Sequence, residues 1–389
     1  MLDYAPQKDT KHKKYIPKSV YTASKERIKE IINITDDRIV MFSGGKDSLV
    51  VLNLVQEVYD ELGINEKVKV AFFDEELIPD FVIDFVIDIY KSNKYDFRYY
   101  AIPLKSFKHS MGVTEGYVQW DPNREWVRQP PSFAITLNDN PEGLSQYNRD
   151  KLVCEGLEGN VAMIKGLRAD EGLYRLKSCL NKPHKTYINK TEYKNIISCK
   201  PIYDWTEKDV FVYFYKNNIN YNENYDKQTW NKQTLRLATP LLPEHRKEWY
   251  KLKTYDPDFY NRIVKIFPEM ILQDRYGKEI QKDDNFEGYE HTIKGLNKYI
   301  EDNLTGDDKN LCKKRIATAL KTRINLIKKG ENKNIFASYP LRVLFMYVRN
   351  GTFKRSLFPQ KPVLKDYLFE GYTEEDYIND KKQNNIKNK

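Results

Sequence analysis

Residues 38–55 read RIVMFSGGKDSLVVLNLV, and this segment gives the clearest indication of the architecture of the chain. The run Arg38–Phe42 is short, apolar and rich in β-branched residues, which predicts a central strand. Apolar residues then recur at helical spacing from Leu49 to Val58. The segment therefore predicts a strand, a glycine-rich turn and a helix, in that order.

The turn between this strand and this helix, Ser43–Ser48, has the composition of a phosphate-binding loop. Gly44 and Gly45 allow the backbone to turn tightly and to approach a polyanion without obstruction by a Cβ atom. The amides of the loop and of the first helical turn then point at phosphate oxygens, and the helix dipole adds to the attraction. The turn differs from the Walker pattern, Gly-x-x-x-x-Gly-Lys-Ser/Thr, although the same physics applies.

The side chains of the turn offer further groups to an anion. Ser43 and Ser48 supply hydroxyl donors, and Lys46 supplies a positive charge. Asp47 suits the first turn of a helix and can also hold Mg²⁺ indirectly. The turn is therefore predicted to bind a phosphate-bearing ligand.

Strands and helices alternate along the remainder of the first 215 residues. Further strands are predicted at Val68–Phe73, Phe97–Ile102, Val161–Lys165 and Ile196–Pro201. Helices are predicted from Thr22 onward and at Pro79–Tyr90, Tyr147–Leu157, Asp170–Lys177 and Thr206–Tyr215. This alternation predicts an α/β fold with a doubly wound, mostly parallel sheet.

Ligands of such sheets bind beyond the carboxyl ends of the strands. Three polar segments fall at predicted strand ends, namely Ser43–Ser48, Asp74–Glu76 and Gly166–Arg168. Their convergence predicts a single nucleotide site at that edge of the sheet.

The stretch from about Lys105 to Asn140 is aromatic and proline-rich without steady periodicity, which predicts a long loop that covers a substrate. Within it, Trp120, Trp126 and Arg128 suit two roles. They can stack on a base and close a lid, or they can pack the loop onto its own domain. The sequence leaves both roles open for the insertion Tyr117–Arg128.

The alternation ends near Asn220, beyond which helices rich in Tyr, Lys and Asn are predicted and no strand alternates with them. The expected organisation is a basic N-terminal arm (1–19), a nucleotide-binding domain (20–220) and a mainly helical C-terminal region (221–389).

The composition is that of a core-forming protein, with 40% hydrophobic and 31% charged residues among 389. No apolar run is long enough to span a bilayer, and residues 1–18 have no apolar segment typical of a secretory signal. The sequence therefore predicts a cytoplasmic protein without a membrane partner.

Cysteine spacing argues against a metal or disulfide framework. The four cysteines are widely spaced and form no Cys-x-x-Cys pair, and the histidines do not cluster with them. No metal ligand is predicted, and the thiols are expected to be reduced and to fill space. They are Cys154, Cys179, Cys199 and Cys312.

Positive charge is concentrated in two stretches of this chain of net charge +9. One is the N-terminal arm, with Lys8, Lys11, Lys13, Lys14 and Lys18, and the other is Cys312–Lys329. These stretches suit nucleic-acid binding and a solvated helix face equally well.

Three motifs, in order, resemble one protein superfamily. Ser43–Ser48 resembles the PP-loop signature of the ATP pyrophosphatases. Gly166–Glu171, followed by Arg175, resembles the arginine-bearing segment of the branch that holds PAPS reductase, the small subunit of ATP sulfurylase and the phosphorothioate DNA-modification protein. Pro201–Asp209 is similar to the Pro-x-x-x-Trp-Thr segment that follows the last core strand of that branch.

The resemblance implies an adenine nucleotide α-hydrolase-like fold with ATP, or a related adenine nucleotide, and Mg²⁺ across the strand ends. In adenylating members a substrate oxygen attacks the α-phosphate and pyrophosphate leaves, so that catalysis is positioning and charge neutralisation. The implied catalytic residues are Lys46, Arg168 and Arg175. The implied nucleotide-binding residues are Ser43, Gly44, Gly45, Lys46, Asp47, Ser48, Asp74, Gly166 and Arg168, with Asp74 beside adenine and ribose.

The chain also departs from the family. PAPS reductases receive the sulfonyl group on a cysteine of a C-terminal tail motif, whereas no cysteine follows Cys312 here. This argues against reduction by that route, although a relay by Cys154, Cys179 or Cys199 stays open.

Three hypotheses result. The first is an adenylyl transferase that cleaves ATP between the α and β phosphates, and the second is sulfonyl transfer from, or reduction of, PAPS. The third is a nucleotide-dependent nucleic-acid-binding or modification module in phage defence. The insertion Tyr117–Arg128 resembles a PAPS-reductase-like subgroup found beside ParB-like partners, so such a partner is a candidate.

Overall fold

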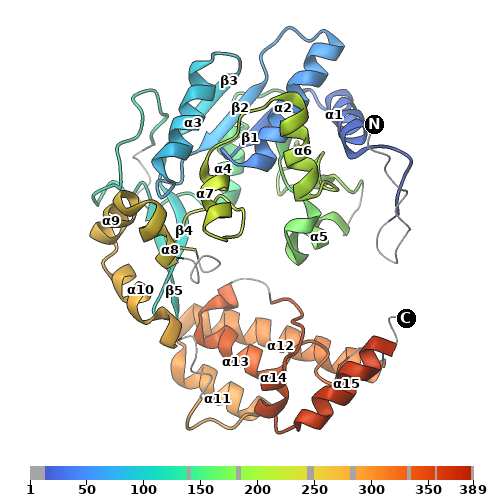
Figure 1. Ribbon diagram of the computed structural model, residues 1–389, viewed down its shortest axis with the longest axis vertical. Helices are drawn as coiled ribbons and strands as arrows, with labels where there is room; N and C mark the ends of the chain where they lie inside the picture. Colours follow the sequence, from blue (N-terminus) through green and yellow to red (C-terminus); the bar gives the residue numbers. More distant parts are fainter. Residues whose placement is uncertain are drawn as a thin grey trace. The chain divides into compact units, whose positions relative to one another are not determined.

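The computed structural model describes residues 14–137, 142–180, 185–242, 249–280, 286–330, 334–354 and 357–386. The chain forms two compact units (Figure 1). Unit 1 takes residues 1–105 and 118–239, and unit 2 takes residues 106–117 and 240–389.

Unit 1 is built on a six-stranded sheet with the order β3-β2-β1-β6-β8-β7. Its neighbouring strands are parallel except for β7, which runs antiparallel to β8. The strands are β1 Asp37–Phe42, β2 Lys69–Phe73, β3 Asp96–Tyr100, β6 Val161–Lys165, β7 Ile188–Lys190 and β8 Ile196–Cys199. The predicted mostly parallel sheet is confirmed.

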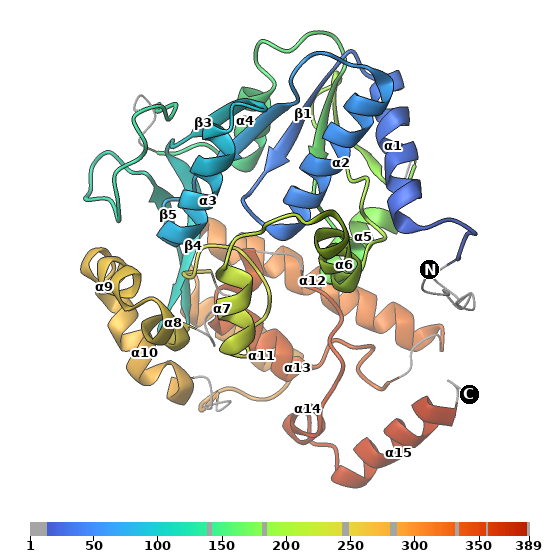
Figure 2. The ribbon, with the colours of Figure 1, turned by 45° about the horizontal axis from the view of Figure 1, so that its top comes forward.

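Helices cover both faces of this sheet because successive strand residues point to opposite sides. Val40 and Phe42 face a core shared with α1, α2, α3 and α6, whereas Ile39 faces a second core that includes Val153 of α4. Figure 2 shows α1, α2 and α3 on one side of the strands. The helices are α1 Val20–Ile34, α2 Lys46–Leu62, α3 Asp80–Lys91, α4 Gln146–Val153, α5 Leu173–Leu180, α6 Glu207–Asn217 and α7 Asn224–Trp230.

The stretch predicted as an irregular loop contains two strands, so that expectation was wrong for its first part. β4 Leu104–Ser110 and β5 Val113–Gln119 form a separate two-stranded sheet, and the chain passes between the two units within them. Met111 and Gly112 join the strands with φ of 50° and 82°. Positive φ at both positions is typical of the tight hairpin turns that Asn-Gly usually forms, and methionine in the first position hides this signal.

Unit 2 is helical beyond residue 240 in the ranges that the structure describes. Its elements are α8 Trp249–Tyr255, α9 Pro257–Ile266, α10 Glu269–Ile280, α11 Ile293–Asn303, α12 Gly306–Lys328, α13 Leu341–Arg349, α14 Leu364–Phe369, α15 Glu374–Ile386 and a 3₁₀ turn at Thr352–Lys354. An aromatic core that includes Phe286, Phe345 and Phe369 holds α11 to α14 together. None of the described helices has the length and apolar character needed to cross a membrane.

Residues 221–239, which the sequence pattern grouped with the helical region, belong to unit 1. This segment contains α7 and lies against the glycine-rich loop, as its contacts below make clear.

Candidate functional site

The glycine-rich loop lies where the strand order of the sheet reverses. β1 has β2 on one side and β6 on the other, and Met41 of β1 is in register with Lys165, the last residue of β6. The loop that follows β1 therefore meets Gly166 at the carboxyl edge of the sheet. Ligands of open α/β sheets bind at such a switch point.

The loop has the backbone of an anion site. Gly44 adopts φ 72°, a left-handed conformation that glycine takes without strain. Gly45 is the N-cap of α2 and provides no side chain to cap the helix. The first amides of a 17-residue helix therefore lack a side-chain cap from their own N-cap residue.

The two serines of the loop bond to each other. The Ser43 amide donates to the Ser48 hydroxyl at 3.1 Å, and the two hydroxyl oxygens are also 3.1 Å apart. The Ser48 hydroxyl donates to the Gly45 carbonyl at 2.9 Å. Both serines thus stabilise the conformation of the turn through hydrogen bonds within it.

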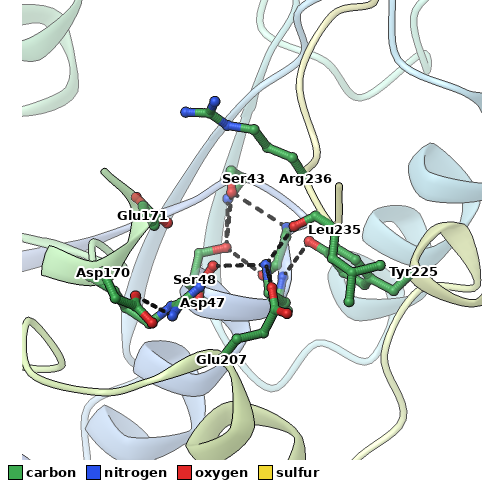
Figure 3. Close-up of polar contacts among 12 residues, drawn as sticks. Ser43, Asp47, Ser48, Asp170, Glu171, Glu207, Tyr225, Leu235 and Arg236 are labelled. Atoms are coloured by element: carbon green, nitrogen blue, oxygen red, sulfur yellow. Dashed lines mark hydrogen bonds and ion pairs between the residues drawn. The ribbon is translucent and has the colours of Figure 1, made fainter. Parts of the chain in front are cut away.

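Lys46, the first residue of α2, is buried with 4% of its surface exposed. Its Nζ donates to the Leu235 carbonyl at 2.8 Å and lies 3.4 Å from Asp47 and 3.6 Å from Glu207 (Figure 3). Its backbone amide donates to the Tyr225 hydroxyl at 2.8 Å. Both polar ends of Lys46 are therefore bonded to residues 225–235.

Arg168 connects the segment after β6 to the first turn of α2. It is 3% exposed, its Nε donates to Asp47 at 2.5 Å, and its second nitrogen bonds Asp170. Burial alone would lower the pKa of Arg168, but the carboxylates of Asp47 and Asp170 outweigh it and raise that pKa. Arg168 is thus a buried, permanently charged group beside the loop rather than an exposed ion pair.

Gly166 allows this close approach. A Cβ added at Gly166 would lie 2.5 Å from the carbonyl carbon of Asp47 and 2.5 Å from the amide nitrogen of Ser48. Any other residue would therefore collide with the backbone of α2.

Arg175 forms its ion pair with Glu171 rather than with a residue of the loop. Its Nε is 3.3 Å from Glu171, which precedes it by one helical turn, and 35% of its side chain is exposed. Burial raises the pKa of Glu171, the charge of Asp47 raises it further, and Arg175 opposes both. The structure thus brings Lys46, Asp47 and Arg168 together, and it connects Arg175 to them through Glu171.

Asp74 follows β2 and makes a different set of contacts. Its fully buried carboxylate accepts hydrogen bonds from the Tyr99 hydroxyl at 2.6 Å, the Glu76 amide at 2.9 Å and Arg128 at 2.5 Å. Burial raises the pKa of Asp74, and the charge of Arg128 opposes the rise. The carboxylate of Asp74 is thus engaged by protein groups, and its expected place beside adenine and ribose stays a prediction.

The aromatic insertion packs onto this acidic turn. Trp120 is buried and donates its indole N–H to the Asp74 carbonyl at 2.6 Å and its amide to Glu76 at 2.7 Å. Arg124 forms a two-pronged ion pair with Glu76. Arg128 lies over the Trp120 ring at 5.3 Å. Of the two roles considered for Trp120 and Arg128, the contacts favour packing of the loop onto its own domain.

A segment that sequence reasoning missed closes over the loop. We call residues 222–237 the strap. Asn222 donates to the Gly44 carbonyl at 2.6 Å, and the Leu237 side chain lies 3.7 Å from the position of a Cβ at Gly44. The strap also supplies Tyr225 and Leu235 to Lys46. Its polar, aperiodic sequence gives no signal of this position.

Acidic side chains pair with several basic residues in the described part of the two basic stretches. Lys8, Lys11 and Lys13 fall outside the described residues, and Lys18 pairs with Glu26 at 2.7 Å. In unit 2, Lys313 of α12 pairs with Glu301, and Arg323 pairs with Glu370. Part of the positive charge of α12 is therefore neutralised locally.

Two curated relatives are similar to this chain. It is 29% identical over 262 residues to the uncharacterized protein YbdN of Escherichia coli (strain K12). The aligned region covers 62% of this chain and 64% of that protein. It is 27% identical over 192 residues to the adenosine 5′-phosphosulfate reductase of Staphylococcus epidermidis (strain ATCC 35984). The aligned region covers 49% of this chain and 66% of that enzyme. The chain thus spans just under two thirds of the length of either relative.

Among solved structures, the phosphoadenylyl-sulfate reductase of Candida auris in complex with phosphate aligns with 57% of this chain and 90% of its own, at 13% identity and a TM-score of 0.32. The family profile of the phosphoadenosine phosphosulfate reductase domain matches residues 37–263, more than half of the chain and including both β1 and the strap. The chain therefore belongs to the phosphoadenosine phosphosulfate reductase domain family.

Proposed function

We propose that the chain binds ATP, or a related adenine nucleotide, at the glycine-rich loop and cleaves it between the α and β phosphates to adenylylate an acceptor. The observation that carries the proposal is the N-terminus of α2 at the switch point, which receives no side-chain cap from its N-cap Gly45 and has buried Arg168 beside it. Backbone amides and a helix dipole at that position attract phosphate. Membership of the family supports an adenine nucleotide as the ligand.

In this proposal each residue has a positioning or charge role. The loop amides hold the pyrophosphate that leaves, and Lys46 and Arg168 neutralise charge that develops on the oxygens of the α and β phosphates. Arg175 acts on the same charge through its pair with Glu171. An oxygen of the acceptor attacks the α-phosphate, the bond to the β-phosphate breaks, and pyrophosphate leaves with the electron pair.

Mg²⁺ fits this site as a companion of the nucleotide. Among the described residues, no three His, Cys, Asp or Glu side chains are grouped to hold a metal ion. Mg²⁺ commonly binds through one or two carboxylates, waters and substrate phosphates. Asp47 lies in the first turn of α2 and already bonds Arg168, so it would act on Mg²⁺ through water.

The test of the proposal is turnover of Mg-ATP with products separated, so that AMP plus pyrophosphate is distinguished from ADP plus phosphate. Sulfate, DNA and RNA are each supplied as acceptor. AMP or an adenylylated acceptor, formed with pyrophosphate, supports cleavage between the α and β phosphates. ATP binding without any such product would overturn the proposed reaction while leaving the nucleotide site intact.

Replacement of Tyr225 by Phe is expected to strengthen ATP binding by a few fold. The hydroxyl of Tyr225 accepts the Lys46 amide that a phosphate oxygen would use, and burial raises the pKa of Tyr225 so that the hydroxyl stays neutral. Without it the amide is free, at a cost of about 1 kcal/mol in folding stability. Equilibrium titration with ATP measures the effect. Weaker binding by the Phe variant would mean that the hydroxyl itself contacts the ligand.

The second candidate, sulfonyl transfer from PAPS to a thiol, is supported by membership of the phosphoadenosine phosphosulfate reductase domain family. Its requirement is a reactive cysteine. All four cysteines are buried, and burial raises the pKa of Cys154 to about 11, of Cys199 to about 12 and of Cys312 to about 11. Thiols with such pKa values are almost entirely protonated at neutral pH, so they are poor nucleophiles.

We therefore expect the cysteines of the native protein to react slowly with iodoacetamide at pH 7.5 and rapidly after unfolding in guanidinium. The rate for Cys154 and Cys312 should rise as the pH approaches 11, because the thiolate fraction increases toward the pKa of these two thiols. Conversion of all four to Ser should leave nucleotide turnover unchanged within about threefold. One rapidly alkylated cysteine whose replacement stops turnover would instead favour sulfonyl transfer.

A further inference from the structure

The charges around the loop do not by themselves favour a polyanion. Among the described residues, the three cations predicted for the site are each within 4 Å of a carboxylate: Lys46 of Asp47 and Glu207, Arg168 of Asp47 and Asp170, and Arg175 of Glu171. Three positive and four negative groups leave a formal charge of −1. A triphosphate that enters this site needs a cation that is not already neutralised.

The strap carries such a cation at Arg236. Its side chain is exposed and, within the part of the chain that the structure describes, it forms no hydrogen bond or ion pair. Figure 3 shows the side chain leaving the strap beside Leu235 and running toward the side of the view where Ser43 lies, and no dashed line ends on its guanidinium group.

The backbone that carries this free side chain is firmly held. The Gln228 amide group donates to the Arg236 carbonyl at 2.6 Å and accepts from the Arg236 amide at 3.0 Å, and Gln228 itself is buried. On either side of it, Leu235 accepts from Lys46 and Leu237 packs at Gly44. Arg236 is therefore fixed in position at its Cα while its guanidinium group stays available.

From this arrangement we infer that Arg236 is a specificity-determining residue that binds the polyphosphate of the nucleotide. The inference rests on the proposed nucleotide site. The planar guanidinium group donates two parallel hydrogen bonds to phosphate oxygens, which a neutral side chain cannot do. Arg236 also brings the formal charge of the cluster from −1 to 0. Its contribution is made to the phosphates, so it distinguishes ATP and ADP from adenosine.

The test is equilibrium titration of the full chain with ATP, ADP and adenosine. Arg236→Ala should weaken ATP binding by about 10- to 100-fold and leave adenosine binding unchanged, because a charge-assisted pair is lost only with the phosphates. Arg236→Lys should restore part of the loss. Lys216→Ala removes another exposed positive charge, from the end of α6, and should bind ATP as the wild type does.

The outcomes separate this inference from the proposed function. Equal ATP affinity of the wild type and Arg236→Ala would overturn the inference alone. Equal weakening of ATP and adenosine would also overturn it, because the effect would then be a disturbance of the strap. A wild type that binds no adenine nucleotide would overturn the proposed function, and the inference with it.

Discussion

Replacement of Lys46 by Ala is expected to lower the rate of AMP and pyrophosphate formation from Mg-ATP by about 100- to 1000-fold. Lys46 begins α2 directly after the glycine turn, and its side chain is 4% exposed, so its charge acts with little screening by water. Loss of that charge removes stabilisation of the phosphate oxygens in the transition state. Single-turnover measurements with saturating ATP report the chemical step itself.

The control for this variant must separate chemistry from folding. The ammonium of Lys46 also holds the Leu235 carbonyl, so its removal loosens the strap. Thermal unfolding measures that loss, and Lys216→Ala serves as the matched change of charge at an exposed position. Pyrophosphate release at the wild-type rate in a folded Lys46→Ala variant would contradict the proposed reaction.

The core of unit 1 was predictable because its signals are local. The short apolar run with β-branched residues that forms β1 is visible in the sequence, and so is the helical spacing after the glycine turn. The position of Arg168 beside the loop also followed, because parallel strands place their carboxyl ends at one edge of the sheet. The tight two-residue hairpin between β4 and β5 lacked its usual Asn-Gly signal.

The strap was not predictable, because its contacts are distant in sequence. Tyr225 and Lys46 are 179 residues apart, and Leu235 and Lys46 are 189 residues apart. Neither periodicity nor composition marks a polar segment that lies on a loop. In the sequence, Arg236 resembles the many other cations of a basic chain. Only the contacts of its neighbours Leu235 and Leu237 show that it lies at the glycine-rich loop.

The acidic turn after β2 shows a different limit. Asp74 and Glu76 follow the end of β2, where carboxylates often contact ligands. The sequence alone does not distinguish carboxylates that bind a ligand from carboxylates that bind side chains of the protein. Their partners Arg124 and Arg128 lie about 50 residues further along, in a segment without regular periodicity. Because the partners are so far apart in the sequence, the ion pairs that hold this loop could not be predicted from it.

Replacement of Gly166 by Ala is expected to weaken ATP binding by about 100-fold and to destabilise the fold by about 1–3 kcal/mol. The new Cβ would lie 2.5 Å from two backbone atoms of Asp47 and Ser48 and 2.6 Å from the Asp47 carbonyl oxygen. Backbone atoms cannot rotate away as a side chain can, so the first turn of α2 or the end of β6 must shift. Either shift moves the amides that would hold the phosphates.

Gly116→Ala provides the matched control, because a Cβ there meets nothing nearer than 3.9 Å and the residue has no positive φ. Denaturant unfolding and ATP titration of both variants separate the two effects. If Gly166→Ala destabilises the fold but binds ATP as the wild type does, then the first turn of α2 is not the phosphate site. If both properties change together, the close approach of the β6 end to α2 is what positions the phosphate-binding amides. That result would tie the glycine after β6 to the same function as the two glycines after β1.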